Sequence, residues 1–357
     1  MARPTNFFKL NANGVADWTD VPAWTEMSVP VPLQLDPGFL AMLPPPAAQS
    51  VTHQAPPVAR TPGEAGEEVI AFDMTETIDG GGLSALRSAP FGGVVTVGTG
   101  TNARLMTNYT SGAVGKYNVT VNFEGVSSQS TGGWTSALQG TFVGAAERIS
   151  KLIVGDVPPV VINGRKIDDI HITATLAEID GPGGILGQAG MTSVRAVSML
   201  PSTGLMRFDT ADAQRYLGMG LFDEIVTHEM LHCIGYGTLW KAKGLVAGNN
   251  FIGQHAVAAY NDLVDAYAAT HNGSTTLANG TVLFKDLVPL ETSGGAGTAG
   301  SHWSENVFNT EMMTGYLDTA PVNGTAVAPL SAMTMASLRD LGYMTGDGGA
   351  TDAFRLV

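Results

Sequence analysis

The spacing of apolar positions predicts two strands and a long helix in the middle of the chain. Polar and apolar residues alternate over 118–123, which is typical of a strand with one buried face. Apolar residues then recur every three or four positions from Trp134 to Leu152, which predicts an amphipathic helix of about five turns. A second alternating strand spans 170–176, and a turn rich in glycine and proline follows at 180–184.

The second half of the chain has a more helical pattern. The expected elements are, in order, a strand near 205–208, a helix capped at Asp209 or Thr210, helices over 220–234 and 252–267, a glycine-rich loop at 294–300, and a helix from Ser331 or Thr334 to Asp340 followed by Gly342. Strands and helices mixed in this order predict an α+β body.

The first 62 residues differ from the rest because they hold eleven of the 19 prolines. Proline fixes φ and removes a hydrogen-bond donor, so an extended arm is expected over 1–65. A small β-rich lead-in is expected over 66–115. The arm also carries large aromatic residues, namely Phe7, Phe8, Trp18, Trp24 and Phe39. They indicate docking, either of the arm on its own body or on a partner protein.

The charge and the cysteine content exclude several classes of protein. With 18 basic and 32 acidic residues among 357, the net charge is −14, which disfavours binding to nucleic acid or to anionic membranes. The single cysteine, Cys233, allows no intrachain disulfide. No apolar run is long enough for a membrane span, and the start shows no Sec signal peptide.

The clearest chemistry lies in the run His228-Glu229-Met230-Leu231-His232. Two histidines four residues apart share one face of a helix, so both rings can reach one zinc ion. Glu229 lies beside them, where it can take a proton from a zinc-bound water without ligating the metal. Apolar residues on the opposite face, Phe222, Val226, Met230 and Cys233, are expected to bury this helix.

A catalytic zinc needs three protein ligands, so a third must come from elsewhere. The position six residues after His232 holds Thr238, which does not supply an imidazole. The residues alone leave several candidates open: His255, His271, His302, Asp262, Asp286 and Glu291.

Several segments together resemble the leishmanolysin-type zinc metallopeptidases, a branch of the metzincins. They are His228-Glu229-x-x-His232-x-x-Gly235, Ser301-His302-Trp303, Glu311-Met312-Met313-Thr314 and the runs at 179–190, 237–240 and 334–343. The resemblance covers about 116–345. It implies three zinc ligands, a general base and a Met-turn methionine, which are His228, His232, His302, Glu229 and Met313, with Met312 as the neighbouring alternative for the last. Leu231 departs from the family, where many members have glycine.

The resemblance also implies a fold and a division of the chain. The expected body is a metzincin-like α+β catalytic domain with a twisted mixed sheet, a long zinc-binding helix and a C-terminal subdomain after the Met-turn. Its upper part would span 116–240, and its lower part would span 241–357. Substrate would add as a strand to an upper edge near 184–191. The implied substrate-binding residues are Gly184, Leu186, Gly187, Gln188 and, near the metal, Tyr316. The histidines left over, His53, His171, His255 and His271, are expected at the surface.

The predicted function is a zinc-dependent endopeptidase that acts on protein or peptide substrates. Two alternatives stay open: a structural or adhesive component of a larger assembly, attached through the arm, and a fold in which zinc is purely structural. An extracellular or particle-associated location is expected, by a route other than a visible Sec signal.

Overall fold

The computed structural model describes residues 105–127, 129–162, 164–179, 186–294, 297–317 and 328–357, and elsewhere only the main chain of short strands. Most of the predicted arm and lead-in, His53 and the turn at 180–184 lie outside the described residues. The short N-terminal strands are β1 (Lys9–Leu10), β2 (Ala16–Asp17), β3 (Val31–Pro32), β4 (Gln34–Leu35), β5 (Val69–Ala71), β6 (Val94–Thr96) and β7 (Arg104–Met106).

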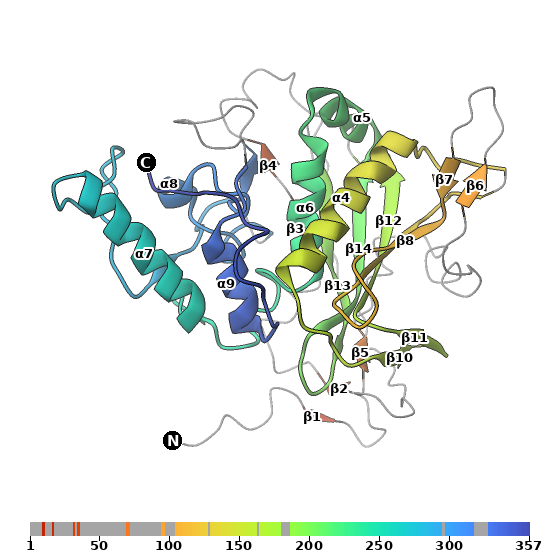
Figure 1. Ribbon diagram of the computed structural model, residues 1–357, viewed down its shortest axis with the longest axis horizontal. Coiled ribbons are helices and arrows are strands. Elements are labelled where there is room, and N and C mark those ends of the chain that lie inside the picture. Colours follow the sequence, from red (N-terminus) through yellow and green to blue (C-terminus); the bar gives the residue numbers. More distant parts are fainter. Residues whose placement is uncertain are drawn as a thin grey trace.

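A seven-stranded mixed sheet forms the centre of the molecule (Figure 1). Its main strands are β8 (Asn108–Thr110), β9 (Val119–Phe123), β12 (Ile170–Ala177), β13 (Gly187–Arg195) and β14 (Pro201–Asp209). β9, β12 and β14 are parallel, whereas β8 and β13 pair antiparallel to their neighbours. On its outer side β13 pairs antiparallel with β3 and β5. The sequence-based prediction of an α+β fold with a mixed sheet is therefore confirmed.

Three helices pack on this sheet and on one another: α4 (Ser136–Leu152), α5 (Thr210–Met219) and α6 (Phe222–Cys233). α4 follows the predicted periodicity, and Asp209 caps α5 by accepting hydrogen bonds from Ala211 N and Asp212 N. The core between helices and sheet is aromatic. Phe142 makes edge-to-face contacts with Phe123, Trp134, Phe208 and Phe222. Through Phe222, this aromatic packing holds α6 against α4 and the sheet.

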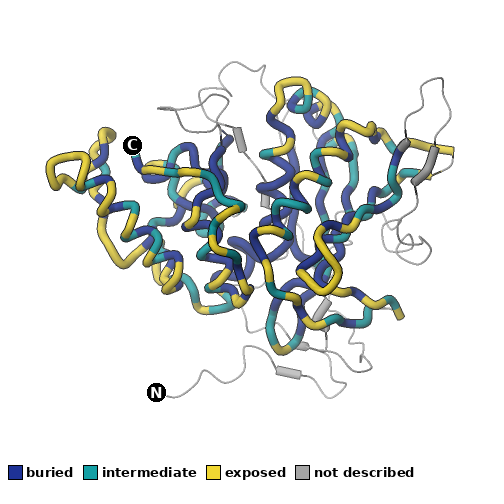
Figure 2. Tube along the Cα trace, viewed as in Figure 1, coloured by how far each residue is buried: buried dark blue, intermediate teal, exposed yellow. Residues whose placement is uncertain are grey.

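The chain after α6 forms a second, mainly helical part, at the left of Figure 1. Its elements are β15 (Val246–Ala247), β16 (Asn250–Phe251), α7 (Gln254–Thr270), β17 (Val288–Pro289), α8 (Glu305–Phe308), β18 (Tyr316–Leu317) and α9 (Ala332–Leu341). α7 packs on α9 and leaves a long exposed side, which Figure 2 shows clearly. By contrast, α6 is buried continuously from Ile225 to Cys233.

The pattern of the sequence predicted the helices better than the strands. α9 begins after Ser331, whose Oγ accepts a hydrogen bond from Thr334 N, and ends at Gly342 with φ +107°, as expected. The pattern missed β13 because its small residues, GQAGMTSVR, lack a strong hydrophobic alternation. It also missed the hairpin of β10 (Val160–Ile162) and β11 (Arg165–Ile167). Among the described residues, no helix combines the length and hydrophobicity needed to cross a bilayer.

Candidate metal centre

Helix α6 presents two histidine rings from successive turns. His228 and His232 are 2% and 0% exposed, and their Nε2 atoms lie 3.0 Å apart. The backbone carries them there because residues i and i+4 of a helix lie one above the other. The helix stops just after them: Gly235, with φ +100°, turns the chain, and a Cβ at this position would lie 2.6 Å from Leu239 Cδ1.

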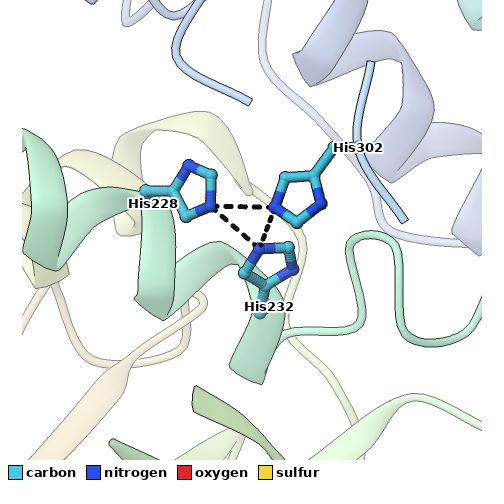
Figure 3. Close-up of side chains that lie close together, drawn as sticks. All are labelled: His228, His232 and His302. Carbon is cyan, nitrogen blue, oxygen red and sulfur yellow. Dashed lines mark hydrogen bonds between the residues drawn. The ribbon is translucent and has the colours of Figure 1, made fainter. Parts of the chain in front are cut away.

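A third ring joins this pair from a loop seventy residues further along the chain. The Nε2 atom of His302 lies 3.1 Å from that of His228 and 3.1 Å from that of His232. Figure 3 shows the three rings with these nitrogens facing one another. Among the described residues, these three form the one cluster of histidine, cysteine or carboxylate side chains close enough to share a metal ion.

The other nitrogen of each ring fixes which way the ring faces. Nδ1 of His228 lies 2.8 Å from Met312 O, Nδ1 of His232 lies 3.0 Å from Tyr236 O, and Nδ1 of His302 lies 3.1 Å from Thr298 O. A carbonyl can only accept, so each Nδ1 carries the proton and donates it. The three Nε2 atoms are then all acceptors and cannot hydrogen-bond to one another.

The lone pairs of these three Nε2 atoms point at one another, an arrangement that a bound cation would stabilise. Nitrogen ligands around a tetrahedral zinc are roughly 3.3 Å from one another, given zinc–nitrogen distances of 2.0–2.1 Å. The observed separations of 3.0–3.1 Å are close to this value. The residues present therefore fit a zinc ion.

The electrostatic environment keeps these rings neutral, as metal ligands must be. Burial lowers the pKa of His228 to about 3 and that of His302 to about 4. Burial, followed by the neighbouring rings, lowers the pKa of His232 well below its usual value. At neutral pH the centre holds no proton that a cation would have to displace from the Nε2 atoms.

The loop that carries His302 is held at its base by a buried carboxylate. Oε1 of Glu291 accepts hydrogen bonds from Thr292 N, Ser293 N and Ser293 Oγ, and its Oε2 accepts one from Glu305 N. Burial alone would raise the pKa of Glu291, but these hydrogen bonds lower it below its usual value. Glu291 was a candidate ligand in the sequence, and its carboxylate is instead used to order the loop.

The same loop passes very close to the turn after α6. A Cβ on Gly237, whose φ is +68°, would lie 2.2 Å from Ser301 O. A glycine is therefore required at this position for Ser301, and with it His302, to approach the helix. Thr238, the position where a compact motif would place its third histidine, donates its hydroxyl to His232 O.

The remaining candidate ligands do not approach the cluster. His255, Asp262, His271 and Asp286 are exposed on and after α7. His271 stacks on Tyr267 with 3.9 Å between ring centroids. The sequence alone does not show which loop folds back over α6, so it could not exclude these positions as ligands.

The predicted general base, Glu229, and the two Met-turn candidates, Met312 and Met313, are all buried. Glu229 is fully buried on α6 and is not part of the three-histidine cluster; its charge helps to raise the pKa of the buried Cys233 thiol, after burial itself. Met313 is fully buried, and its carbonyl accepts a hydrogen bond from Trp303 N. Met312 contacts His228 through its carbonyl oxygen, as described above.

The predicted substrate-binding residues that the structure describes lie in β13, directly before it, or in β18. Leu186 is 1% exposed, and a Cβ on Gly187 would lie 2.7 Å from the Phe208 ring, so both positions face the core. Gln188 is half-buried and pairs with Pro32 of β3. Gly184 lies outside the described residues. Tyr316 is half-buried, and its hydroxyl lies 3.3 Å from Ser293 Oγ.

One prediction about the other histidines is wrong. His171 was expected at the surface, on the polar face of its strand, but it is 3% exposed. Its strand β12 lies between β9 and β14, and His171 lines a pocket of about 350 Å³ together with residues 166–168 of the β11 region. Alternation along a strand shows which face a residue is on, but not whether another segment covers that face.

Comparison with known proteins connects this geometry to a family. Residues 180–353 match the family model described as leishmanolysin. Leishmanolysin from Leishmania chagasi is 27% identical over 196 residues, which is 54% of this chain and 29% of that protein. The chain thus spans less than a third of the length of this relative. Over residues 180–353, where the histidine cluster lies, the chain is leishmanolysin-like and is related to a family of metallopeptidases.

Proposed function

We propose that this protein is a zinc-dependent endopeptidase. The observation that supports the proposal is that the Nε2 atoms of three buried histidine rings converge. The Nδ1–H of each ring donates a hydrogen bond to a backbone carbonyl. His228, His232 and His302 would hold the ion. Three protein ligands leave one position of a tetrahedral ion for water or substrate, which is the arrangement of a catalytic rather than a structural site.

The chain's own residues then have distinct roles. When bound, zinc would polarise a substrate carbonyl and lower the pKa of water at its open position. Glu229 would accept the proton of the attacking water and deliver it to the leaving amine. Its place on α6, between the two ligating histidines in sequence, supports this role.

Substrate would bind along the outer side of β13 by strand addition. Gln188 and Ala189 already pair there with β3, antiparallel, so this side of the strand accepts an added main chain. β3 and a substrate would compete for the same hydrogen-bonding groups. A variant that lacks residues 1–65 should therefore show a lower KM for peptides than the full chain, and an equal or higher KM would remove this binding mode.

The experiment that tests the proposed function combines zinc analysis with casein digestion, with and without a chelator. Wild-type protein should contain about one zinc per chain and digest casein, and chelation should stop digestion until zinc is restored. Glu229→Gln should keep the zinc and lose activity by a factor of about 10² to 10⁴. Asp223→Asn, an exposed change on the same helix, is the matched control and should keep both. Zinc-loaded wild type without peptidase activity, or full activity in Glu229→Gln, would contradict the proposal.

A further inference from the structure

A buried carboxylate lies directly behind the candidate metal centre. Glu311 is 1% exposed, and its Oε2 accepts a hydrogen bond of 2.6 Å from Met313 N. Its Oε1 accepts hydrogen bonds from Ser331 N, Ser331 Oγ and Thr334 Oγ1, at 3.0, 2.6 and 2.5 Å. Within the described part of the chain its partners are these donors and no lysine or arginine. A carboxylate buried without a cation is costly, so its four hydrogen bonds must compensate.

The position of Glu311 links it to His228 through a single peptide group. The carbonyl of Met312 accepts the Nδ1–H of His228 at 2.8 Å, and the N–H of Met313 is held by Glu311. These two atoms belong to the same peptide bond, which is planar and rigid. Holding its N–H therefore aims its C=O at the histidine. Hydrogen bonds in such a chain also polarise one another, so the carboxylate strengthens the carbonyl as an acceptor.

A second connection reaches the third histidine. The indole Nε1 of Trp303 donates to Thr334 Oγ1 at 2.8 Å, and Thr334 Oγ1 in turn donates to Glu311. Trp303 N also donates to Met313 O at 3.0 Å. Trp303 directly follows His302 in the chain. Glu311 is thus connected to His228 through the Met312–Met313 peptide, and through Thr334 to Trp303, the residue that follows His302.

We propose that Glu311 is a positioning residue for the metal centre. It fixes the Met312–Met313 peptide so that His228 keeps its proton on Nδ1 and turns Nε2 toward the metal. Metal-ligating histidines commonly donate their second nitrogen to a carboxylate or a carbonyl, and loss of such a partner costs metal affinity. Here the Met312 carbonyl accepts the hydrogen bond from His228, and the Glu311 carboxylate holds the peptide group that bears this carbonyl. The inference rests on the proposed function only in taking zinc as the metal.

The test measures metal binding, not peptidase activity. Glu311→Gln keeps the volume of the side chain but turns one oxygen into an amide donor, which would face either Met313 N–H or the donors at Ser331 and Thr334. Zinc affinity, measured by competition with a chelating dye, should fall about 10- to 100-fold. The absorption spectrum of the Co²⁺-loaded protein should also change, because the geometry of the ligand set changes.

Asp169→Asn is the matched control for general damage to a buried carboxylate. Asp169 is also 1% exposed and accepts hydrogen bonds from Asn118 N and Val157 N, none of which belongs to the metal centre. It should lower thermal stability and leave zinc affinity and the Co²⁺ spectrum unchanged. Thr334→Val removes one donor to Glu311 and should lower zinc affinity by a smaller factor, about 3- to 10-fold.

The possible results separate this inference from the proposed function. If wild-type protein binds no zinc, the proposed function fails. If wild type binds zinc but Glu311→Gln has the affinity and spectrum of Asp169→Asn, the positioning role is overturned. Should Glu311→Gln not fold, Thr334→Val decides the matter by the same comparison with Asp169→Asn.

Discussion

Two buried histidine environments in this molecule share a low pKa but differ in what their rings contact. At the metal centre, each Nδ1 donates to a carbonyl and the three Nε2 atoms converge. Among the described residues, neither ring nitrogen of His171 has a hydrogen-bond partner, and His171 belongs to no group of three side chains that could share a metal ion. Burial is the first cause that lowers the pKa in both places, to about 3 for His171 and for His228.

The difference shows that burial and a low pKa do not by themselves indicate a metal site. What distinguishes the centre is the set of carbonyls behind the rings, which fixes the tautomer and the direction of each Nε2. His171 instead borders a cavity of about 350 Å³ with polar neighbours, Thr120 and Lys166 among them. Changes at the candidate metal centre should therefore alter metal binding, whereas changes at His171 should leave it unaltered.

The largest expected effect comes from removing the third ring. His302→Ala leaves two ligands, which do not hold a catalytic zinc, so purified protein should contain less than about a tenth of a zinc per chain. His171→Ala should keep the wild-type content, although it also removes a buried imidazole. Metal analysis after dialysis against a weak chelator makes this comparison. Equal zinc content in the two variants would contradict the assignment of His302 as a zinc ligand.

A smaller effect is expected from crowding the loop that delivers His302. Gly237→Ala places a Cβ against Ser301 O and should destabilise the fold by about 2–4 kcal/mol and weaken zinc binding. Gly244→Ala is a matched control, since its φ of +69° is nearly the same but nothing lies within 4 Å of the added Cβ. Urea unfolding of both variants separates the close contact from the cost of the backbone conformation. Equal losses would mean that the approach of Ser301 to Gly237 is unimportant.

The acid stability of the zinc-free protein should reveal His171. Its folded pKa of about 3 lies below the unfolded value near 6.5, so the unfolded chain binds the extra proton and stability falls as pH falls between those values. This one ring contributes a slope of about 1.4 kcal/mol per pH unit. His171→Gln cannot titrate and should reduce the slope between pH 6 and 4 by that amount. An unchanged slope would show that His171 is protonated in the folded state.

No effect on the metal is expected from the histidines of the α7 region. His255 and His271 are exposed and remote from the cluster, so His255→Ala combined with His271→Ala should leave zinc content and zinc affinity at wild-type values. The same dye competition used for the other variants measures this. A drop in affinity would mean that the third ligand has been assigned to the wrong residue.

The residues of the candidate metal centre differ in how much of their arrangement the sequence alone could predict. His228, Glu229 and His232 could be read from spacing on one helix, since helix geometry alone relates them. His302 followed only from resemblance, because the residues left it among several candidates joined by long loops. The roles of Glu291 and Glu311 could not be read from any pattern, because they arise from amide and hydroxyl donors that the folded chain brings to these carboxylates. For the fold, the hydrophobic periodicity predicted the long helices. It did not predict β13, which consists mostly of small residues, or the β10–β11 hairpin, which lines the pocket beside His171.

An anomalous-scattering map at the zinc absorption edge, from crystals of the zinc-loaded protein, would locate the ion and its ligands. We expect one strong peak about 2.0–2.1 Å from Nε2 of His228, His232 and His302, with no fourth protein ligand. A peak at any other group of residues, or a fourth side chain closing the coordination sphere, would contradict a catalytic zinc at this centre.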